Sequence, residues 1–376
     1  MNTKVLIIAG EASGDLHGAS LMREMKRLKP DISFYGIGGD KMFSEGLHQL
    51  YHIDKMAFLG FVEVIKHLPF IKKVRTEVIN LVKKNNIKNV ILIDYPGFNL
   101  NLAKKLKSIG LKVFYYISPQ LWAWGSGRIE KIKKYVDKML VLFPFEQKLY
   151  REHGIDVTFV GHPLIHQLDE YKFEDKEKLF NKYGLNKTKE ILLLLPGSRK
   201  QEVEKIFPDA IDGAIEVAKE FNLQVVVGCA DSIDEKVFSQ LTNQKDFKVV
   251  KNVTYDLIKQ STFGIIKSGT STLEAALLGL PMVIVYKTNA LTYKIGKALV
   301  KLKNIGLANI VAGKTIVPEL IQNEVNKNSI FKVSKNILNN RELYNKLKSE
   351  LLELRKTLGE KQASTEAAQI ICGSLI

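Results

Sequence analysis

Residues 263–286 read FGIIKSGTSTLEAALLGLPMVIVY: an apolar run, a short polar turn, a segment of helical length and a second apolar run. This order predicts a strand–helix–strand unit, in which the turn SGTSTLE leads from the first strand directly into the helix. A helix that begins there directs backbone N–H groups and hydroxyls at one point, where the helix dipole also favours negative charge. The turn suits a pyrophosphate, although it also fits an ordinary capped helix.

A carboxylate follows one turn inside the expected helix, on the same side as the polar turn. This residue is Glu274, and its two oxygens could accept hydrogen bonds from the two hydroxyls of a ribose. The segment therefore predicts a grip for a nucleoside diphosphate. Its expected members are Ser268, Gly269, Thr270, Ser271 and Glu274.

The same alternation of apolar runs and amphipathic segments continues along the whole chain. It indicates an α/β fold with parallel sheets, and 376 residues are enough for two doubly wound domains. A polar stretch over residues 164–186 marks the expected linker. Ligands bind at the carboxyl ends of such strands, so we expect two Rossmann-like halves that face each other across a cleft. The expected strands lie within residues 4–10, 33–39, 89–96, 112–118, 138–144, 157–163, 190–198, 223–230, 247–251, 263–269 and 281–287.

The composition limits the partners and the compartment. A net charge of +16 implies anionic partners, which could be nucleic acid, an anionic membrane surface or phosphorylated small molecules. Only Cys229 and Cys372 are present, far apart, so we expect a reducing compartment and no disulfide. The start of the chain lacks the layout of a signal peptide, and no apolar stretch reaches spanning length, so a cytoplasmic protein is expected.

The loop after the first expected strand reads GEASGDLHG, over residues 10–18. Its glycines recur every fourth residue, which fits neither the dinucleotide fingerprint nor the phosphate loop of nucleoside triphosphatases. Three polar residues, Glu11, Ser13 and Asp15, could line a binding site there. Either Ser13 or Asp15 could instead cap the following helix.

Asp94 ends the apolar run VILID and precedes a Pro-Gly turn. A carboxylate at the carboxyl end of a central parallel strand is partly desolvated, and its pKa can rise into the range of a general base. The alternative is that Asp94 only caps the turn.

Arg199 follows another apolar strand in the segment PGSRKQEVEKIFP. A guanidinium beside a helix N-terminus can bind a phosphate through two hydrogen bonds, although a solvent-facing arginine needs no ligand. Metal ligands are poorly supported, because the sequence contains no H-E-x-x-H and no D-x-D. We therefore expect no metal and no cofactor, and arginine, amides and helix dipoles would neutralise the phosphates.

Several segments occur in an order that resembles the lipid-A-disaccharide synthase family. They are GEASGD, AFLGFVEV, IDYPGFN, SPQLWAW, FPFE, GHP, LLPGSR, SGTSTLEA and NIVAGK, and they span nearly the whole chain. The resemblance implies the two-domain GT-B fold of metal-independent glycosyltransferases. It also implies transfer of 2,3-diacylglucosamine from its UDP derivative to 2,3-diacylglucosamine 1-phosphate, with inversion and release of UDP.

The resemblance implies roles for the residues found above. Asp94 matches the family's candidate base, and Arg199 with the amides around Ser268 to Ser271 would hold the diphosphate. Asn309 falls in a loop on the nucleotide side. Many relatives have proline before that asparagine, whereas this chain has Ala308. The implied domains are residues 1–165 for the acceptor and the membrane, 166–345 for the UDP-sugar, and 346–376 as helices that pack back on the first domain. The family also suggests a homodimer.

The stretch AFLGFVEVIKHLPFIKKV, residues 57–74, is too apolar for one solvent-facing helix. Charged residues interrupt it, so we expect it to lie in the interface of the cytoplasmic membrane and to accept acyl chains, with nearby lysines attracted to anionic lipid. A buried core helix is the alternative. The expected acyl-facing residues are Phe58, Phe61, Val62, Ile65, Leu68 and Phe70.

Two other classes of protein remain as alternatives. A UDP-N-acetylglucosamine 2-epimerase would use the same fold and nucleotide grip without an acyl-facing surface. A nucleic-acid-binding protein would explain the charge, but the lysines are scattered over helix faces rather than interleaved with aromatic residues. We therefore expect small-molecule partners and no nucleic acid.

Overall fold

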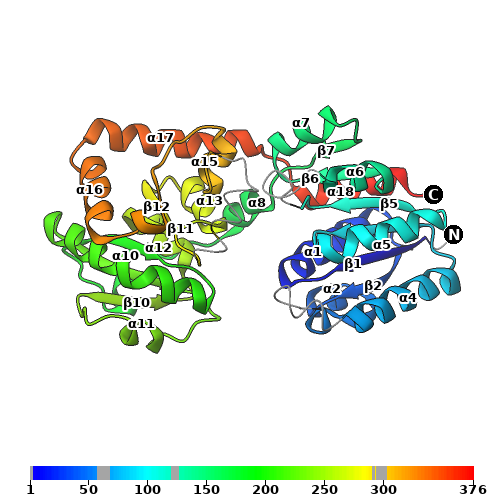
Figure 1. Cartoon of the computed structure of the whole chain (residues 1–376), viewed down its shortest axis with the longest axis horizontal. Coiled ribbons are helices and arrows are strands. Elements are labelled where there is room, and N and C mark those ends of the chain that lie inside the picture. Colours follow the sequence, from blue (N-terminus) through cyan, green and yellow to red (C-terminus); the bar gives the residue numbers. More distant parts are fainter. Residues whose placement is uncertain (1–2, 57–67, 120–126, 290–292, 294–302) are drawn as a thin grey trace. The chain divides into compact units, whose positions relative to one another are not determined.

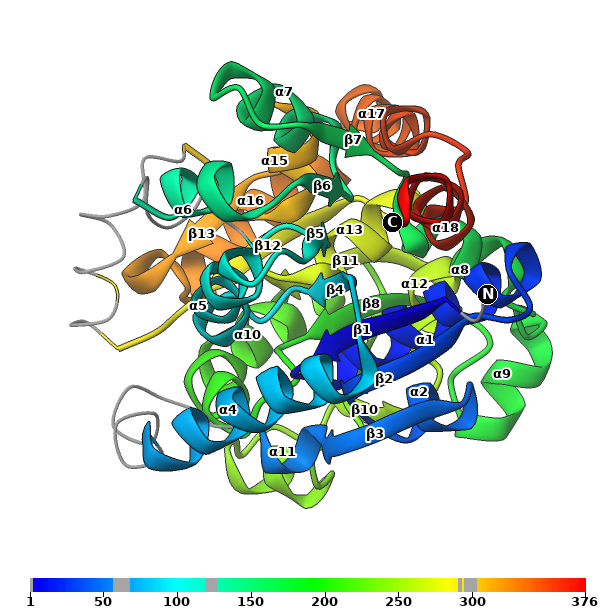
Figure 2. The same ribbon diagram turned by 90° about the vertical axis from the view of Figure 1, so that its right-hand side faces the viewer.

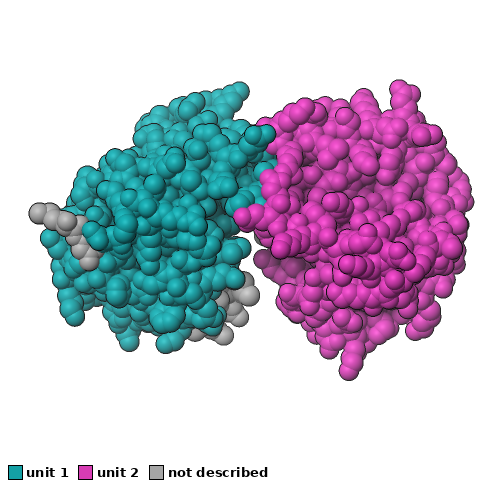
Figure 3. All heavy atoms as spheres, turned by 180° about the vertical axis from the view of Figure 1, so that it is seen from behind, with its two compact units in different colours: residues 1–166, 358–376 teal, residues 167–357 magenta. Residues whose placement is uncertain are grey.

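The computed structural model describes residues 3–56, 68–119, 127–289, 293 and 303–376. The chain forms two compact units, which Figure 3 shows in different colours. The first comprises Met1–His166 with Leu358–Ile376, and the second comprises Gln167–Thr357. The second unit is therefore continuous in sequence, whereas the first is completed by the last segment of the chain.

The first unit is built on a parallel sheet with the strand order β3-β2-β1-β4-β5-β6-β7. The central strands are almost entirely apolar and buried, as expected for a sheet covered on both faces. The strands are β1 (Lys4–Ala9), β2 (Ser33–Gly38), β3 (Leu47–His52), β4 (Asn89–Ile93), β5 (Lys112–Tyr116), β6 (Lys138–Val141) and β7 (Val157–Phe159).

Helices cover the two faces of this sheet (Figure 2). Their side chains form two apolar cores with the strands. One core packs α4, α5 and α6 against the strands, and the other packs α1, α2 and the C-terminal α18. The helices and turns of this part of the chain are α1 (Ala12–Leu28), α2 (Asp40–Ser44), η1 (Ile53–Lys55), α4 (Leu68–Asn85), α5 (Pro96–Ser108), α6 (Gly127–Tyr135), α7 (Pro144–Glu152), α8 (Pro163–Glu170) and α18 (Ala363–Ser374).

The second unit, coloured from green to orange in Figure 1, repeats this winding. Its strand order is β10-β9-β8-β11-β12-β13, again parallel. Its strands are β8 (Glu190–Leu195), β9 (Leu223–Cys229), β10 (Phe247–Lys251), β11 (Ser261–Lys267), β12 (Met282–Tyr286) and β13 (Glu319–Ile321). Its helices and turns are α9 (Lys176–Tyr183), α10 (Lys200–Glu220), α11 (Lys236–Gln240), α12 (Thr254–Gln260), α13 (Thr270–Leu277), α15 (Leu307–Ala312), η2 (Gln322–Glu324), α16 (Lys327–Leu338) and α17 (Arg341–Leu358).

All of the strands expected from the sequence are present, and the prediction of two parallel α/β units is confirmed. β3 and β13 are not predicted from the sequence. Both are edge strands of their sheets, and each pairs with one neighbouring strand. An edge strand is less completely buried than a central one, so it does not need a long apolar run. β3 has the mixed sequence LHQLYH, and β13 has only 3 residues.

Candidate active site

Each sheet changes its direction of winding at one pair of neighbouring strands, β1 with β4 in the first unit and β8 with β11 in the second. Ligands of doubly wound sheets bind beyond the carboxyl ends of such a pair. In the first unit, these ends lead to Glu11 and Asp94. In the second unit, they lead to Arg199 and Ser268. The residues singled out in the sequence thus follow the strands where a ligand is expected.

Asp94 has an unusual backbone that its neighbours hold in place. Its φ is 41° and that of Tyr95 is 48°, in the left-handed region that side chains rarely adopt. The Asp94 carbonyl accepts hydrogen bonds from Tyr115 Oη (2.6 Å) and Asn99 Nδ2 (2.8 Å). Such strain persists where surrounding contacts fix it, and it is concentrated at functional sites. Neither supporting residue is predicted from the sequence, although Asn99 stands within the family segment IDYPGFN.

The Asp94 carboxyl has a raised pKa. Burial, and then the negative charge of Glu11, raise this pKa to about 6, against an opposing hydrogen bond from the Tyr95 backbone. The Tyr95 ring covers Gly10, because a Cβ added to Gly10 would lie 2.3 Å from the ring Cγ. A carboxyl with this pKa can accept a proton near neutral pH.

The two other polar residues predicted in the first loop differ in their surroundings. Asp15 is 4% exposed, and its carboxylate accepts hydrogen bonds from the backbone N–H groups of Gly39 (2.7 Å), Lys41 (3.1 Å) and Met42 (3.0 Å). It therefore fixes the start of α2, which is a structural function. Ser13 is exposed in the first turn of α1.

The turn SGTSTLE joins β11 to α13 as the sequence predicted. α13 begins at Thr270, so the backbone N–H groups of Thr270 and Ser271 lie in its first turn, where a helix has no internal acceptors for them. The Ser268 hydroxyl donates to the Ile305 carbonyl (2.8 Å). Its side chain thus holds the loop that leads to α15, while the helix N-terminus supplies the positive end of the dipole.

Glu274 lies in α13 with its carboxylate partly buried. Burial raises its pKa, and hydrogen bonds with Tyr255 and Ser271 oppose that shift. Tyr255 Oη lies 3.5 Å from Glu274 Oε1, and the Tyr255 ring packs edge-on against Tyr171 at 5.0 Å between centroids. The carboxylate is therefore oriented by two hydroxyls, of which the sequence analysis noted only Ser271.

Arg199 stands directly before α10, and its side chain is 75% exposed. Its guanidinium donates to Glu202 Oε1 at 3.2 Å. Lys267 Nζ also donates to Glu202 Oε1, at 2.9 Å. Through these two ion pairs, Glu202 links the turn after β8 to the end of β11.

Asn309 is completely buried at the start of α15. Its Nδ2 donates to the Val317 carbonyl and to Glu319 Oε1, each at 2.8 Å, and its Oδ1 accepts from the backbone of Ile316 (2.8 Å) and Val317 (3.0 Å). These bonds make it the centre of the loop between α15 and β13. Its side chain shapes this loop.

The expected acyl-facing segment is described only in part. Phe58, Phe61, Val62 and Ile65 lie outside the described residues. Leu68, at the start of α4, is 44% exposed, whereas Phe70 packs edge-on against Tyr51 at 5.6 Å and borders the core. Within this set, only Leu68 is seen to present an apolar side chain to the surface.

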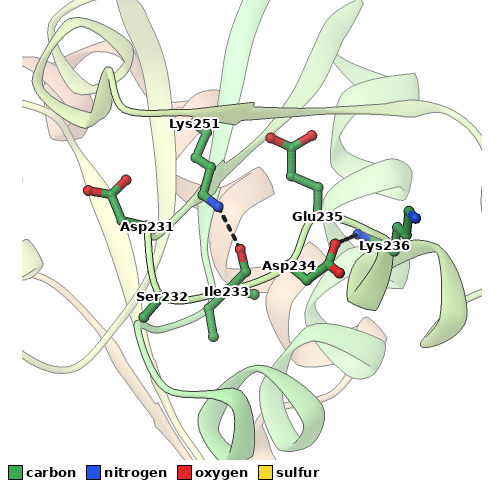
Figure 4. Close-up of a pocket in the computed structure, with 7 residues that line it drawn as sticks. All are labelled: Asp231, Ser232, Ile233, Asp234, Glu235, Lys236 and Lys251. Carbon is green, nitrogen blue, oxygen red and sulfur yellow. Dashed lines mark hydrogen bonds between the residues drawn. The ribbon is translucent and has the colours of Figure 1, made fainter.

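A cavity of about 550 Å³ lies at the ends of β9 and β10 (Figure 4). Lys251 Nζ donates to the Ile233 carbonyl at 2.8 Å, and Ser232 Oγ donates to the Ser198 carbonyl at 2.7 Å. The acidic side chains among its lining do not suit a diphosphate. The lining residues are Asp231, Ser232, Ile233, Asp234, Glu235, Lys236 and Lys251.

Neither a metal centre nor a membrane span is found in the part of the chain that the structure describes. No group of three or more His, Cys, Asp or Glu side chains there could hold a metal ion. None of the helices described is both long and apolar enough to cross a bilayer.

Two doubly wound parallel units, each with a switch point where ligands of such sheets bind, define an enzyme of the GT-B architecture. Solved structures share this fold across the full chain. The glycotransferase of kitacinnamycin has a TM-score of 0.64 at 12% identity, covering 100% of both chains. The UDP-GlcNAc 2-epimerase from Neisseria meningitidis, bound to UDP-GlcNAc, has a TM-score of 0.62 at 10% identity, covering 98% of this chain and 99% of that one.

Sequence comparison identifies the family. The model of the Lipid-A-disaccharide synthetase family matches residues 5–371. The lipid-A-disaccharide synthase of Syntrophus aciditrophicus is 41% identical over 98% of this chain and 97% of that protein. The lipid-A-disaccharide synthase of Geobacter sulfurreducens is 38% identical over 98% of this chain and 96% of that protein. The chain belongs to the lipid-A-disaccharide synthetase family.

This membership confirms the resemblance found in the sequence. It favours hexosyl transfer from a UDP-sugar over the epimerase alternative. The UDP-GlcNAc 2-epimerases among the solved structures are only 10–14% identical to this chain, which supports a shared fold and no more.

Proposed function

We propose that the protein transfers 2,3-diacylglucosamine from its UDP derivative to the 6-hydroxyl of 2,3-diacylglucosamine 1-phosphate. The products are the β-1,6-linked disaccharide 1-phosphate and UDP. The observation that carries this proposal is the position and pKa of Asp94 in a member of this family. Asp94 directly follows β4, a strand at the switch point of its sheet, and its pKa of about 6 suits a general base.

The chemistry is a single displacement. The Asp94 carboxylate takes the proton of the acceptor hydroxyl as that oxygen attacks the anomeric carbon from the face opposite UDP. The bond between the anomeric carbon and the diphosphate oxygen breaks, and its electron pair leaves with UDP. The anomeric centre is therefore inverted.

The second unit binds the nucleotide in this proposal. Arg199 and the N-terminus of α13 neutralise the diphosphate, and Glu274 accepts hydrogen bonds from the ribose. Ser268 and Asn309 act through the loops they stabilise, which lie before and after α15 and shape the nucleotide side. Gly269, Thr270 and Ser271 contribute the turn around the phosphates.

The first unit binds the acceptor. Glu11 and Ser13 would contact it, because both are exposed beyond the end of β1. Asp15 contributes to this site indirectly, because its carboxylate fixes the start of α2. The apolar segment around Leu68 docks on the inner face of the cytoplasmic membrane, because both substrates carry acyl chains. The protein acts there as a peripheral enzyme. Its proposed oligomeric state is a homodimer.

The decisive experiment mixes the purified protein with both diacyl sugars and follows the products by mass spectrometry and UDP release. A disaccharide mass that appears together with UDP supports the proposal. An epimerised UDP-sugar formed without acceptor would replace it with the epimerase alternative.

A further inference from the structure

A single carboxylate connects the turn that follows β8 to the end of β11. Glu202 Oε2 accepts hydrogen bonds from the backbone N–H groups of Ser198 (3.2 Å) and Arg199 (3.3 Å). Glu202 Oε1 lies 3.2 Å from the Arg199 guanidinium and 2.9 Å from Lys267 Nζ. Arg199, in the turn after β8, and Lys267, at the end of β11, therefore share one carboxylate oxygen.

Lys267 places its ammonium beside the start of α13. A Cβ added to Gly269, the residue before this helix, would lie 3.8 Å from Lys267 Nζ. β8 and β11 are paired neighbours, with Leu195 opposite Ile266, so the two turns leave the sheet side by side. The Lys267 side chain is only 17% exposed, whereas that of Arg199 is 75% exposed. Lys267 is thus the more firmly placed of the two cations.

The charges of this cluster do not cancel. Arg199 and Lys267 bring two positive charges against the single negative charge of Glu202, and the N-termini of α10 and α13 add positive potential. The pKa of Glu202 is lowered: burial raises it, but the hydrogen bond and charge of Lys267, with smaller contributions from Ser198 and Arg199, outweigh this effect. The cluster is an ionised unit with an excess of positive charge, which suits a diphosphate.

We propose that Lys267 is a second diphosphate-binding cation, which donates a hydrogen bond to the departing UDP while Glu202 keeps it in place. This inference rests on the proposed function. When the anomeric C–O bond breaks, the electron pair stays on a phosphate oxygen, and the Lys267 ammonium stabilises that charge without giving up its proton. Glu202 is a positioning residue, because it acts through Lys267 and the turn of Arg199.

The test compares the binding of UDP with that of uridine, which lacks the phosphates. Lys267→Met should weaken UDP binding by about 10- to 100-fold, the usual effect of losing a hydrogen bond to a charged group, and leave uridine binding unchanged. Lys267→Gln removes the charge but can still donate to Glu202, so it tests the charge in a protein whose local structure is kept. Lys267→Arg should restore much of the affinity.

Lys335→Met is the matched control, because Lys335 pairs with Glu220 at the opposite end of α10. It should bind UDP like the wild type. If the wild type binds UDP and Lys267→Gln binds it equally well, or if UDP and uridine weaken together, the inference about Lys267 is wrong while the proposed function stands. If the wild type does not bind UDP, both fail.

Discussion

Asp94 combines a strained backbone with a carboxyl whose pKa is raised to about 6. Asp94→Asn keeps the shape of the side chain and removes the basic oxygen. We expect kcat to fall by about 10²- to 10⁴-fold while the protein stays folded, because a positioned base contributes on this order. Initial rates with both substrates test this, with circular dichroism as the control for folding. Near-normal turnover would make Asp94 a structural residue.

The same carboxyl predicts the pH dependence of the reaction. The base works in its ionised form, so kcat/KM should rise with pH through about 6 and then level off. The negative charge of Glu11 contributes to the raised pKa, so Glu11→Gln should move this inflection to lower pH. Rate profiles from pH 4.5 to 8 measure both. An inflection that does not move would show that the charge of Glu11 does not act on the base.

The nucleotide grip is tested by Arg199→Ala and Glu274→Ala. Each should weaken UDP binding by about 1 to 3 kcal/mol, the cost of losing a charged hydrogen-bond partner. Calorimetric titration of UDP measures this, and Glu324→Ala, in the turn after β13, is a control in the same unit. Unchanged affinity in both variants would move the nucleotide site away from these turns.

At the scale of single elements, the carboxylate of Asp15 holds the start of α2. Asp15→Ala would leave buried N–H groups of Gly39 and Met42 without this acceptor. We expect a loss of about 1 to 3 kcal/mol in the free energy of unfolding, measured by urea denaturation. Asp31→Ala, at an exposed position, should change it by less than about 0.5 kcal/mol. Equal effects of the two variants would contradict the structural role.

The segment that leads into the start of α4 provides the test of membrane docking. Replacing Phe58, Phe61, Ile65 and Leu68 with serine should release the protein from vesicles that contain anionic lipid and leave UDP binding intact. Phe70 is kept, because it packs against Tyr51. Val78→Ser, in the core face of α4, is the contrasting change and should destabilise the fold. A quadruple variant that precipitates would instead indicate that the segment is part of the core.

The sequence predicted the strands and the residues at their ends for one physical reason. Buried parallel strands are continuous apolar runs, and the polar residues that follow each run mark the carboxyl edge, as Asp94 and Arg199 do. The structural roles of Asp15 and Asn309 could not be predicted in this way. Their side chains bond backbone groups of other segments, and the polarity of a residue does not reveal such partners.

At the scale of the whole molecule, the second unit interrupts the first. The chain leaves the first unit within α8, forms the complete second unit, and returns at the end of α17. α18 then packs beside α1 and completes the second apolar core of the first unit. The final residue is also fixed, because Asn89 Nδ2 donates to the carbonyl of Ile376 at 2.9 Å and Asn89 Oδ1 accepts from its backbone N–H at 3.2 Å.

This arrangement has a consequence for biosynthesis on the ribosome. α18 is translated only after Gln167–Thr357, which at about 5 to 20 residues per second takes roughly 10 to 40 seconds. During that interval, the surface of α1 that α18 will cover is not yet protected, although the rest of the first unit has already emerged. The second unit can finish folding before the first does, and the nascent first unit is the part of the chain that would need a chaperone.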